Sequence, residues 1–298
     1  MPAESKIRAA FVLFIVQIFG KNTIILLLSI VFLRPMFTVH NILSYIRWRM
    51  HARDRQGHRI HSPFLYSLIT NNLYNRITDD WVSEVERYRK QLLADKTSVD
   101  ITDYGTGSRF ASGNTRRVRD IARHSSTSPR DGRLLSNLAT AMQCHNILEL
   151  GTNLGLGTLY LANSAHCEQL VTIEGCPNLS TIANSNFNQL CINKITVINE
   201  EFSKALPKAL KMLPSLDFLF IDGNHNGDAT FSYFTQCLPY AGNDTVFVID
   251  DIHKDSSMES AWAKIIDNEQ VTLSLDFFTM GVLFFRSQLS KQTICLRY

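Results

Sequence analysis

The stretch Glu149-Leu-Gly-Thr-Asn-Leu-Gly-Leu-Gly-Thr158 decides the fold class of this 298-residue chain. It continues a short apolar run, Ile147–Leu150, and its glycines are spaced G-x-x-x-G-x-G. Glycine lets the backbone approach a ligand closely, and open α/β sheets bind their ligands at the carboxyl ends of their strands. The spacing differs from the G-x-G-x-x-G of dinucleotide-binding proteins, and no Tyr-x-x-x-Lys pair is present, so an NAD-dependent reductase is the less favoured alternative.

From Asn146 onward, apolar strand-like runs alternate with segments of helix length, which predicts a mostly parallel α/β sheet with helices on both faces. The last two runs, Val271–Phe277 and Met280–Phe285, are separated only by a short turn and therefore predict a C-terminal antiparallel hairpin. The other predicted strands are Ile147–Leu150, Leu170–Ile173, Ile195–Ile198, Leu216–Ile221 and Thr245–Ile249, with helices expected to begin near Gly155, Pro177, Ser203, Ala229 and Met258.

An acidic residue follows the second predicted strand, in Ile173-Glu174-Gly175. A carboxylate at this position can accept hydrogen bonds from both hydroxyl groups of a ribose. The alternative for Glu149 and Glu174 is an ordinary solvated carboxylate at the end of a strand. The glycine stretch and Glu174 together favour a site for a ribose-containing cofactor.

Carboxylates also end the fourth and fifth predicted strands, in Phe220-Ile-Asp222-Gly-Asn-His225 and Val248-Ile-Asp250-Asp251. We expect Asp222, Asp250 and Asp251 to lie at one rim of the sheet, where their charges repel one another. A divalent cation that prefers oxygen ligands, such as Mg²⁺, would relieve this repulsion. The alternative is that these are ordinary aspartates that cap turns at the start of loops.

The glycine stretch, Glu174 and the segment Asp131-Gly-Arg-Leu-Leu-Ser136 together resemble the class I S-adenosylmethionine-dependent methyltransferases. The last segment is similar to the catechol and caffeoyl-coenzyme-A O-methyltransferase families. The resemblance covers about Gly132 to Phe285 and implies a Rossmann-like methyltransferase sheet that binds S-adenosylmethionine. The residues that it implies for cofactor binding are Glu149, Gly151, Thr152, Asn153, Gly155, Gly157, Thr158, Glu174, Gly175 and Asp222.

The two strands that end in aspartates resemble metal-dependent O-methyltransferases, including those that act on macrolide sugars and cephalosporin intermediates. This resemblance implies that Asp222, Asp250 and Asp251 bind Mg²⁺ and that His225 is the base that deprotonates a hydroxyl acceptor. The catechol-type enzymes have Asp-Asn where this chain has Asp250-Asp251, and their substrate loop is not recognisable. We therefore expect a small-molecule or sugar-like acceptor without identifying it. A non-catalytic scaffold of the same fold is the alternative, against which the intact set of acidic residues and His225 argues.

Two segments precede the predicted methyltransferase domain of residues 131–298. Residues 1–50 form an apolar and basic extension in which residues 9–33 are long enough for a membrane helix, although Gly20-Lys21-Asn22 interrupts them. Arginines follow this run, so the positive-inside rule places the domain in the cytoplasm. An over-extended start, or an apolar helix packed on the domain, is the alternative.

Residues 51–130 form a helical and loop-rich cap region. Ser62-Pro63 predicts a helix start, Asp79–Leu93 predicts an amphipathic helix that is rich in charge and faces solvent, and residues 103–133 are expected to be mostly loop. The composition is that of a globular protein, with 45% hydrophobic residues and a net charge of +3, too small to indicate a nucleic-acid partner. Six scattered cysteines indicate a reducing compartment. The sequence leaves the oligomeric state open.

Overall fold

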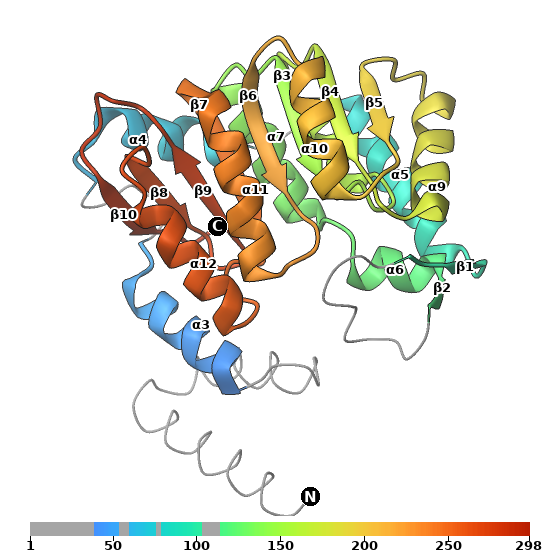
Figure 1. Ribbon diagram of the computed structural model, residues 1–298, viewed down its shortest axis with the longest axis horizontal. Helices are drawn as coiled ribbons and strands as arrows, with labels where there is room; N and C mark the ends of the chain where they lie inside the picture. Colours follow the sequence, from blue (N-terminus) through green and yellow to red (C-terminus); the bar gives the residue numbers. More distant parts are fainter. Residues whose placement is uncertain (1–38, 54–59, 76–78, 103–113) are drawn as a thin grey trace, which may run out of the picture. The chain divides into compact units, whose positions relative to one another are not determined.

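The computed structural model describes residues 39–53, 60–75, 79–102 and 114–298 (Figure 1). The chain divides into two compact units, Met1–Arg49 and Met50–Tyr298. In the first unit the described part belongs to α3 (Val39–His51). The predicted membrane helix at residues 9–33 lies outside the described residues. Among the helices that are described, none has the length and apolar character that a membrane span requires.

An eight-stranded sheet forms the centre of the second unit, in the order β10-β8-β9-β7-β6-β3-β4-β5. Neighbouring strands from β7 to β5 are parallel, whereas β9 is antiparallel to both β7 and β8. The predicted α/β sheet with an antiparallel C-terminal hairpin is confirmed. The strands are β3 (Asn146–Leu150), β4 (Gln169–Ile173), β5 (Ile195–Ile198), β6 (Leu216–Ile221), β7 (Ala241–Asp250), β8 (Leu273–Asp276), β9 (Met280–Phe284) and β10 (Gln292–Cys295).

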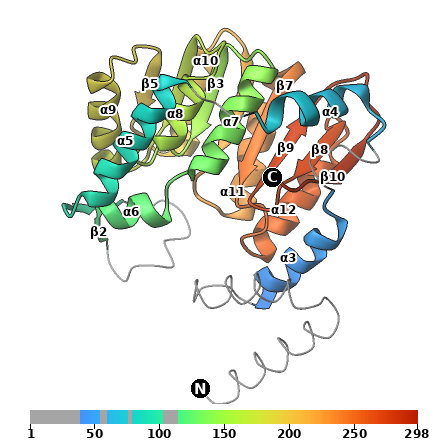
Figure 2. The same cartoon turned by 180° about the vertical axis from the view of Figure 1, so that it is seen from behind.

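Helices cover both faces of this sheet. Along β6, Phe218 and Phe220 belong to the apolar core on the side of α7, whereas Leu219 and Ile221 belong to the core on the side of α10, α11 and α12. The second group of helices covers the face seen in Figure 1, and α7 covers the face seen in Figure 2. The helices are α7 (Pro129–Ala141), α8 (Leu156–Ala162), α9 (Pro177–Gln189), α10 (Phe202–Met212), α11 (Gly227–Cys237), η2 (Leu238–Tyr240) and α12 (Ser256–Asp267).

The elements between Met50 and the sheet differ from expectation in two respects. The amphipathic helix predicted at Asp79–Leu93 is present as α5, but its charged side chains do not all face solvent, because Arg89 is buried with the apolar side. The described part of the expected loop, from residue 114, contains a short strand and a helix. The elements are α4 (Pro63–Ser67), which Ser62 caps as predicted, a π-helical turn η1 (Leu68–Leu73), α5 (Asp80–Ala94), β1 (Ser98–Asp100), β2 (Thr115–Arg117) and α6 (Val118–His124).

Candidate active site

The glycine loop between β3 and α8 is fixed by the absence of side chains at two positions. Gly151 and Gly155 have φ angles of +110° and +82°, which side chains rarely adopt. A Cβ atom on Gly151 would lie 2.1 Å from the carbonyl oxygen of Asp222, and one on Gly155 would lie 2.6 Å from the ring of Phe187. The loop therefore passes directly against the end of β6 and against α9.

Glu149 lies buried beneath this loop. Its Oε2 atom accepts hydrogen bonds from the hydroxyl groups of Thr158, at 2.5 Å, and Thr172, at 2.7 Å. Burial raises the pKa of Glu149 to about 7 against the opposing effect of these hydrogen bonds. Above it, a Cβ atom on Gly157 would lie 2.7 Å from Thr127 Oγ1 and 3.1 Å from Glu149 Oε1. The hydrogen-bonded pair of Glu149 and Thr158 thus lies directly beneath the glycine loop and supports it.

Glu174, at the end of β4, holds the other side of the loop. Its Oε2 atom accepts a hydrogen bond of 2.7 Å from the backbone N–H of Asn153, and its Oε1 atom accepts one of 2.9 Å from Cys176. Thr152 is tied to β4 through its hydroxyl, 2.6 Å from that of Thr172. The carbonyl oxygen of Gly175 accepts a bond from Asn199. All of the predicted cofactor-binding positions except Asp222 therefore gather around the carboxyl ends of β3 and β4.

Polar atoms near the loop test whether a cofactor fits. Asn153 Oδ1 and Ser126 Oγ are buried and have no hydrogen-bond partner among the described residues. The side-chain amide of Asn153 donates to the carbonyl oxygen of Ser125, so the two segments touch. Buried polar atoms without partners are rare in folded proteins. Hydroxyl and amino groups of a nucleoside would supply partners here, so the residues fit S-adenosylmethionine.

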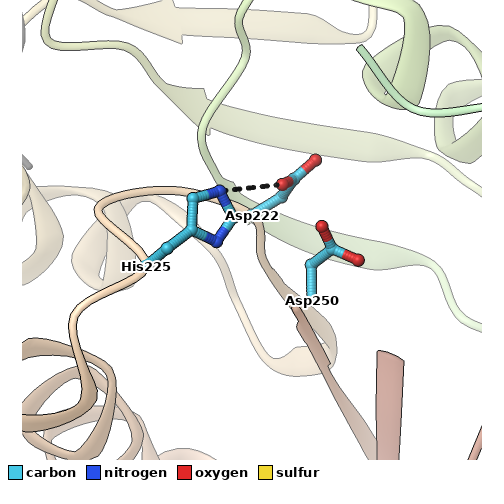
Figure 3. A group of neighbouring side chains, drawn as sticks. All are labelled: Asp222, His225 and Asp250. Carbon is cyan, nitrogen blue, oxygen red and sulfur yellow. Dashed lines mark ion pairs between the residues drawn. The ribbon is translucent and has the colours of Figure 1, made fainter. Parts of the chain in front are cut away.

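A second group of side chains lies at the ends of β6 and β7. Asp222 follows β6 and Asp250 ends β7. Figure 3 shows these two side chains beside His225, and one ligand atom from each of the three lies within 4.8 Å of the others. The described residues contain no other group of this kind. His225 Nε2 lies 3.7 Å from Asp222 Oδ1.

Asp251 lies outside this group of three, although the sequence places it with the metal ligands. Its backbone has a φ of +56°, and its side chain is 45% exposed. Asp251 Oδ2 lies 3.7 Å from Nδ1 of His225, so the imidazole stands between Asp222 and Asp251. The structure thus groups His225 with Asp222 and Asp250, and it places Asp251 on the other side of the imidazole.

The electrostatics of the rim favour a cation. Burial raises the pKa of Asp222 well above its usual range, and the charges of Asp251 and Glu149 add to this effect. Burial likewise raises the pKa of Asp250, with further contributions from Asp222 and Asp251. Two carboxylate oxygens are donors that Mg²⁺ prefers, whereas the imidazole nitrogen of His225 suits a wider range of divalent metals. The donor set therefore fits a divalent cation.

Two further residues near the rim were not predicted as site residues. Asp131, in the first turn of α7, raises the pKa of both Asp222 and Asp250 through its charge. The sequence signal that could have identified Asp131 is its place at the start of the segment Asp131–Ser136, which carries part of the family resemblance. His253 lies between Glu259, with 2.8 Å from Nδ1 to Oε1, and Asp276, with 2.9 Å from Nε2 to Oδ2. Burial lowers the pKa of His253, but these two ion pairs outweigh it and raise the pKa overall.

Comparison with known proteins agrees with this geometry. A protein-family model described as a methyltransferase domain matches residues 148–252. The chain is 29% identical over 142 residues to catechol O-methyltransferase of Niastella koreensis, covering 45% of this chain and 61% of that protein. It is 28% identical over 132 residues to the enzyme of the same name from Mycobacterium tuberculosis, covering 42% and 56%. The matches thus span about three fifths of these relatives.

A solved structure shows the same fold. The methyltransferase PaMTH1 of Podospora anserina, solved with S-adenosylhomocysteine, superimposes with a TM-score of 0.53 at 14% identity, over 72% of this chain and 91% of that one. Fold and sequence together place the chain among the class I S-adenosylmethionine-dependent methyltransferases. The part of the chain that the sequence matches cover is similar to catechol O-methyltransferases.

Proposed function

We propose that this protein transfers the methyl group of S-adenosylmethionine to a hydroxyl group of a small molecule, assisted by Mg²⁺. The observation that carries the proposal is the contact between the two halves of the site. Gly151, in the glycine loop, lies against the backbone carbonyl of Asp222. Asp222 is one of the three aspartates of the acidic rim, with Asp250 and Asp251. A methyl donor on the loop and a hydroxyl on the rim would therefore be close neighbours, and such alignment removes much of the entropic barrier to transfer.

Asp222 and Asp250 are the residues that we propose to hold the cation. Burial is the main cause of their raised pKa values, and the charge of Asp251 raises both further, so two bare carboxylates are costly at this place. When bound, Mg²⁺ would supply Lewis acidity that lowers the pKa of a coordinated hydroxyl. The two aspartates would also orient the acceptor.

His225 is the group that we propose to take the proton. Its side chain is 26% exposed and borders both Asp222 and Asp251. In the transfer, the acceptor oxygen gains the methyl carbon, the carbon–sulfur bond breaks, and the hydroxyl proton moves to a ring nitrogen of His225. S-adenosylhomocysteine is the second product. Imidazole is suited to this step because it accepts protons near neutral pH.

For the acceptor, we propose a compound with hydroxyl groups on neighbouring carbons. The relatives named catechol O-methyltransferase favour an aromatic diol. This chain has Asp250-Asp251 where the catechol-type enzymes have Asp-Asn, so its acceptor can differ from theirs. A sugar-like diol is therefore the second class to test. Either class offers two adjacent oxygens to a cation held by Asp222 and Asp250.

The test is a methyl-transfer assay with purified protein, labelled S-adenosylmethionine, and panels of catechols and sugar diols, with Mg²⁺ or with a chelator. We expect labelled methyl ether and an equal amount of S-adenosylhomocysteine, and a large loss of both in the chelator. Binding of S-adenosylhomocysteine without transfer to any acceptor would favour the scaffold alternative instead.

We further propose that residues 9–33 attach the protein to a membrane and leave the methyltransferase domain in the cytoplasm. The length and apolar character of this segment support the proposal, as do the arginines that follow it. The full chain should sediment with membrane vesicles, and a chain that begins at Met50 should remain in the supernatant. Equal partitioning of both proteins would contradict the proposal.

A further inference from the structure

Helix α5 lies outside the sheet, beside α8 (Figure 2). Its buried residues Val85 and Leu92 share an apolar cluster with Leu154 and Leu159, which belong to the glycine loop and to α8. The same face of α5 also carries polar side chains. This is unusual for a helix that only completes a core, because buried polar groups must find partners to avoid a desolvation cost.

Tyr88 makes the first polar contact. Its hydroxyl donates a hydrogen bond of 2.9 Å to the backbone carbonyl of Leu154, and both residues are buried. Leu154 lies between Asn153, which Glu174 holds, and Gly155, which has left-handed backbone geometry. Burial raises the pKa of Tyr88, so the phenol keeps the proton that it donates. Tyr88 therefore fixes the middle of the glycine loop.

Arg89, the next residue, makes the second contact. Its Nη2 atom donates a bond of 2.8 Å to the backbone carbonyl of Thr127. Its Nε atom lies 3.3 Å from Oε1 of Glu86, and the same oxygen accepts a bond of 2.6 Å from Tyr160 of α8. Arg89 is buried, and a buried guanidinium is tolerated when it is paired in this way.

The two carbonyl groups that α5 binds belong to two segments that line one site. Leu154 is in the glycine loop, which is one wall, and Thr127 is in residues 125–128, which are the other. Thr127 lies over Gly157 of the glycine loop, since a Cβ atom there would be 2.7 Å from Thr127 Oγ1. The walls also meet directly, where the side-chain amide of Asn153 donates to the carbonyl of Ser125. Both contacts of α5 are to backbone atoms, so they constrain the conformation of each wall whatever side chains it carries.

We propose that α5 is a structural part of the cofactor site, in which Tyr88 and Arg89 act as positioning residues that hold the glycine loop and residues 125–128 in the conformation that receives the cofactor. The inference rests on the proposed function, because it assumes that the loop binds S-adenosylmethionine. Support of this kind, from residues that do not touch the ligand, is what keeps a binding site within its working geometry.

The test compares Tyr88→Phe and Arg89→Met with matched controls in the full chain. Tyr66→Phe removes a phenol that is 49% exposed, and Arg87→Met removes a guanidinium that is 65% exposed on the same helix. S-adenosylhomocysteine affinity is measured by titration calorimetry at a temperature where every variant is folded. Amide hydrogen exchange of residues 151–157 is measured without ligand.

We expect affinity to fall about three- to tenfold in Tyr88→Phe, and at least as much in Arg89→Met, as the loss of one buried hydrogen bond predicts. Exchange in residues 151–157 should become faster in both variants, and the controls should match the parent. Arg89→Lys should be intermediate, because an ammonium group can reach Thr127 or Glu86 but lacks the fork that serves both. Arg89→Lys also replaces Arg89→Met in the comparison if the latter does not fold.

The outcomes separate the two proposals. If the parent binds S-adenosylhomocysteine and both variants bind it equally well with unchanged exchange, the role of α5 is wrong and the proposed function stands. If the parent itself does not bind, the proposed function fails, and the role of α5 in a cofactor site fails with it.

Discussion

The backbone of Gly151 packs against the backbone of Asp222 so closely that a Cβ atom on the glycine would lie 2.1 Å from the aspartate carbonyl oxygen. The amide of Asp222 also donates to the carbonyl of Leu150 at 2.8 Å. The glycine loop between β3 and α8 and the acidic rim are therefore joined through main-chain atoms. A shift in either one must move the other.

Gly151→Ala is expected to destabilise the protein, because the new methyl group meets backbone atoms and the φ of +110° is strained for alanine. We expect the free energy of unfolding to fall by about 2 kcal/mol or more, measured by urea denaturation. Gly242→Ala is the control, since its Cβ atom would meet only Thr245 Oγ1 at an ordinary 3.7 Å. Equal stability of Gly151→Ala and the parent would show that the close contact is wrong.

Asp222→Asn and Asp250→Asn are expected to weaken binding of a divalent cation at least tenfold, because each removes a charged oxygen ligand. Binding is measured with Mn²⁺ by electron paramagnetic resonance, as a spectroscopic substitute for Mg²⁺. Asp244→Asn is the control, since that carboxylate is 68% exposed and pairs with Arg286. If all three variants bind Mn²⁺ as the parent does, the ion is not held at this rim.

His225→Gln separates two roles of the imidazole. As a base, its loss should lower turnover by roughly 100- to 10,000-fold and leave Mn²⁺ affinity and cofactor affinity unchanged. As a metal ligand, its loss should weaken Mn²⁺ binding in parallel with turnover. We expect the first result. Undiminished turnover would remove His225 from the chemistry altogether.

Glu149→Gln should change how stability depends on pH. Burial raises the pKa of Glu149 from its ordinary 4.5 to about 7, so between these values the folded chain holds a proton that the unfolded chain has released. The contribution of Glu149 to stability therefore falls as pH rises through this window, by about 3 kcal/mol in total. Glutamine keeps an oxygen that can accept from Thr158 and Thr172 and does not titrate.

The measurement for this prediction is the free energy of unfolding of the parent and of Glu149→Gln from pH 5 to pH 8, by urea denaturation without cofactor. The variant should gain on the parent as pH rises from 5 to about 7, keep that gain at higher pH, and be the more stable protein at pH 8. A constant difference across the range would mean that Glu149 does not titrate there.

The sheet was predictable from sequence because its central strands are buried on both faces. Runs such as Leu216–Ile221 are therefore almost continuously apolar and stand out from the helices between them. The edge strand β10, Gln292–Cys295, was missed, because only Ile294 in it is buried and its other residues carry no strand pattern. That Asp222 and Asp250 lie at one rim was also predictable, because both stand at the ends of strands of a parallel sheet.

The contacts that complete the site were not predictable, because they join residues that are distant in sequence. Tyr88 reaches Leu154 across 66 positions, and Arg89 reaches Thr127 across 38. The pattern of α5 therefore predicted an amphipathic helix whose charged residues face solvent, without these two contacts. The resemblance to metal-dependent enzymes did place His225 at this rim, where it lies with Asp222 and Asp250. The position of Asp251 on the other side of the imidazole was not predicted.

Titration of S-adenosylhomocysteine into the full chain by calorimetry tests the central claim most directly, with Glu174→Ala as the comparison. We predict micromolar binding to the parent and binding at least tenfold weaker to the variant, because Glu174 both holds Asn153 and is the proposed partner of the ribose. No binding to a folded parent would contradict the account. Equal binding to Glu174→Ala would show that the cofactor lies elsewhere.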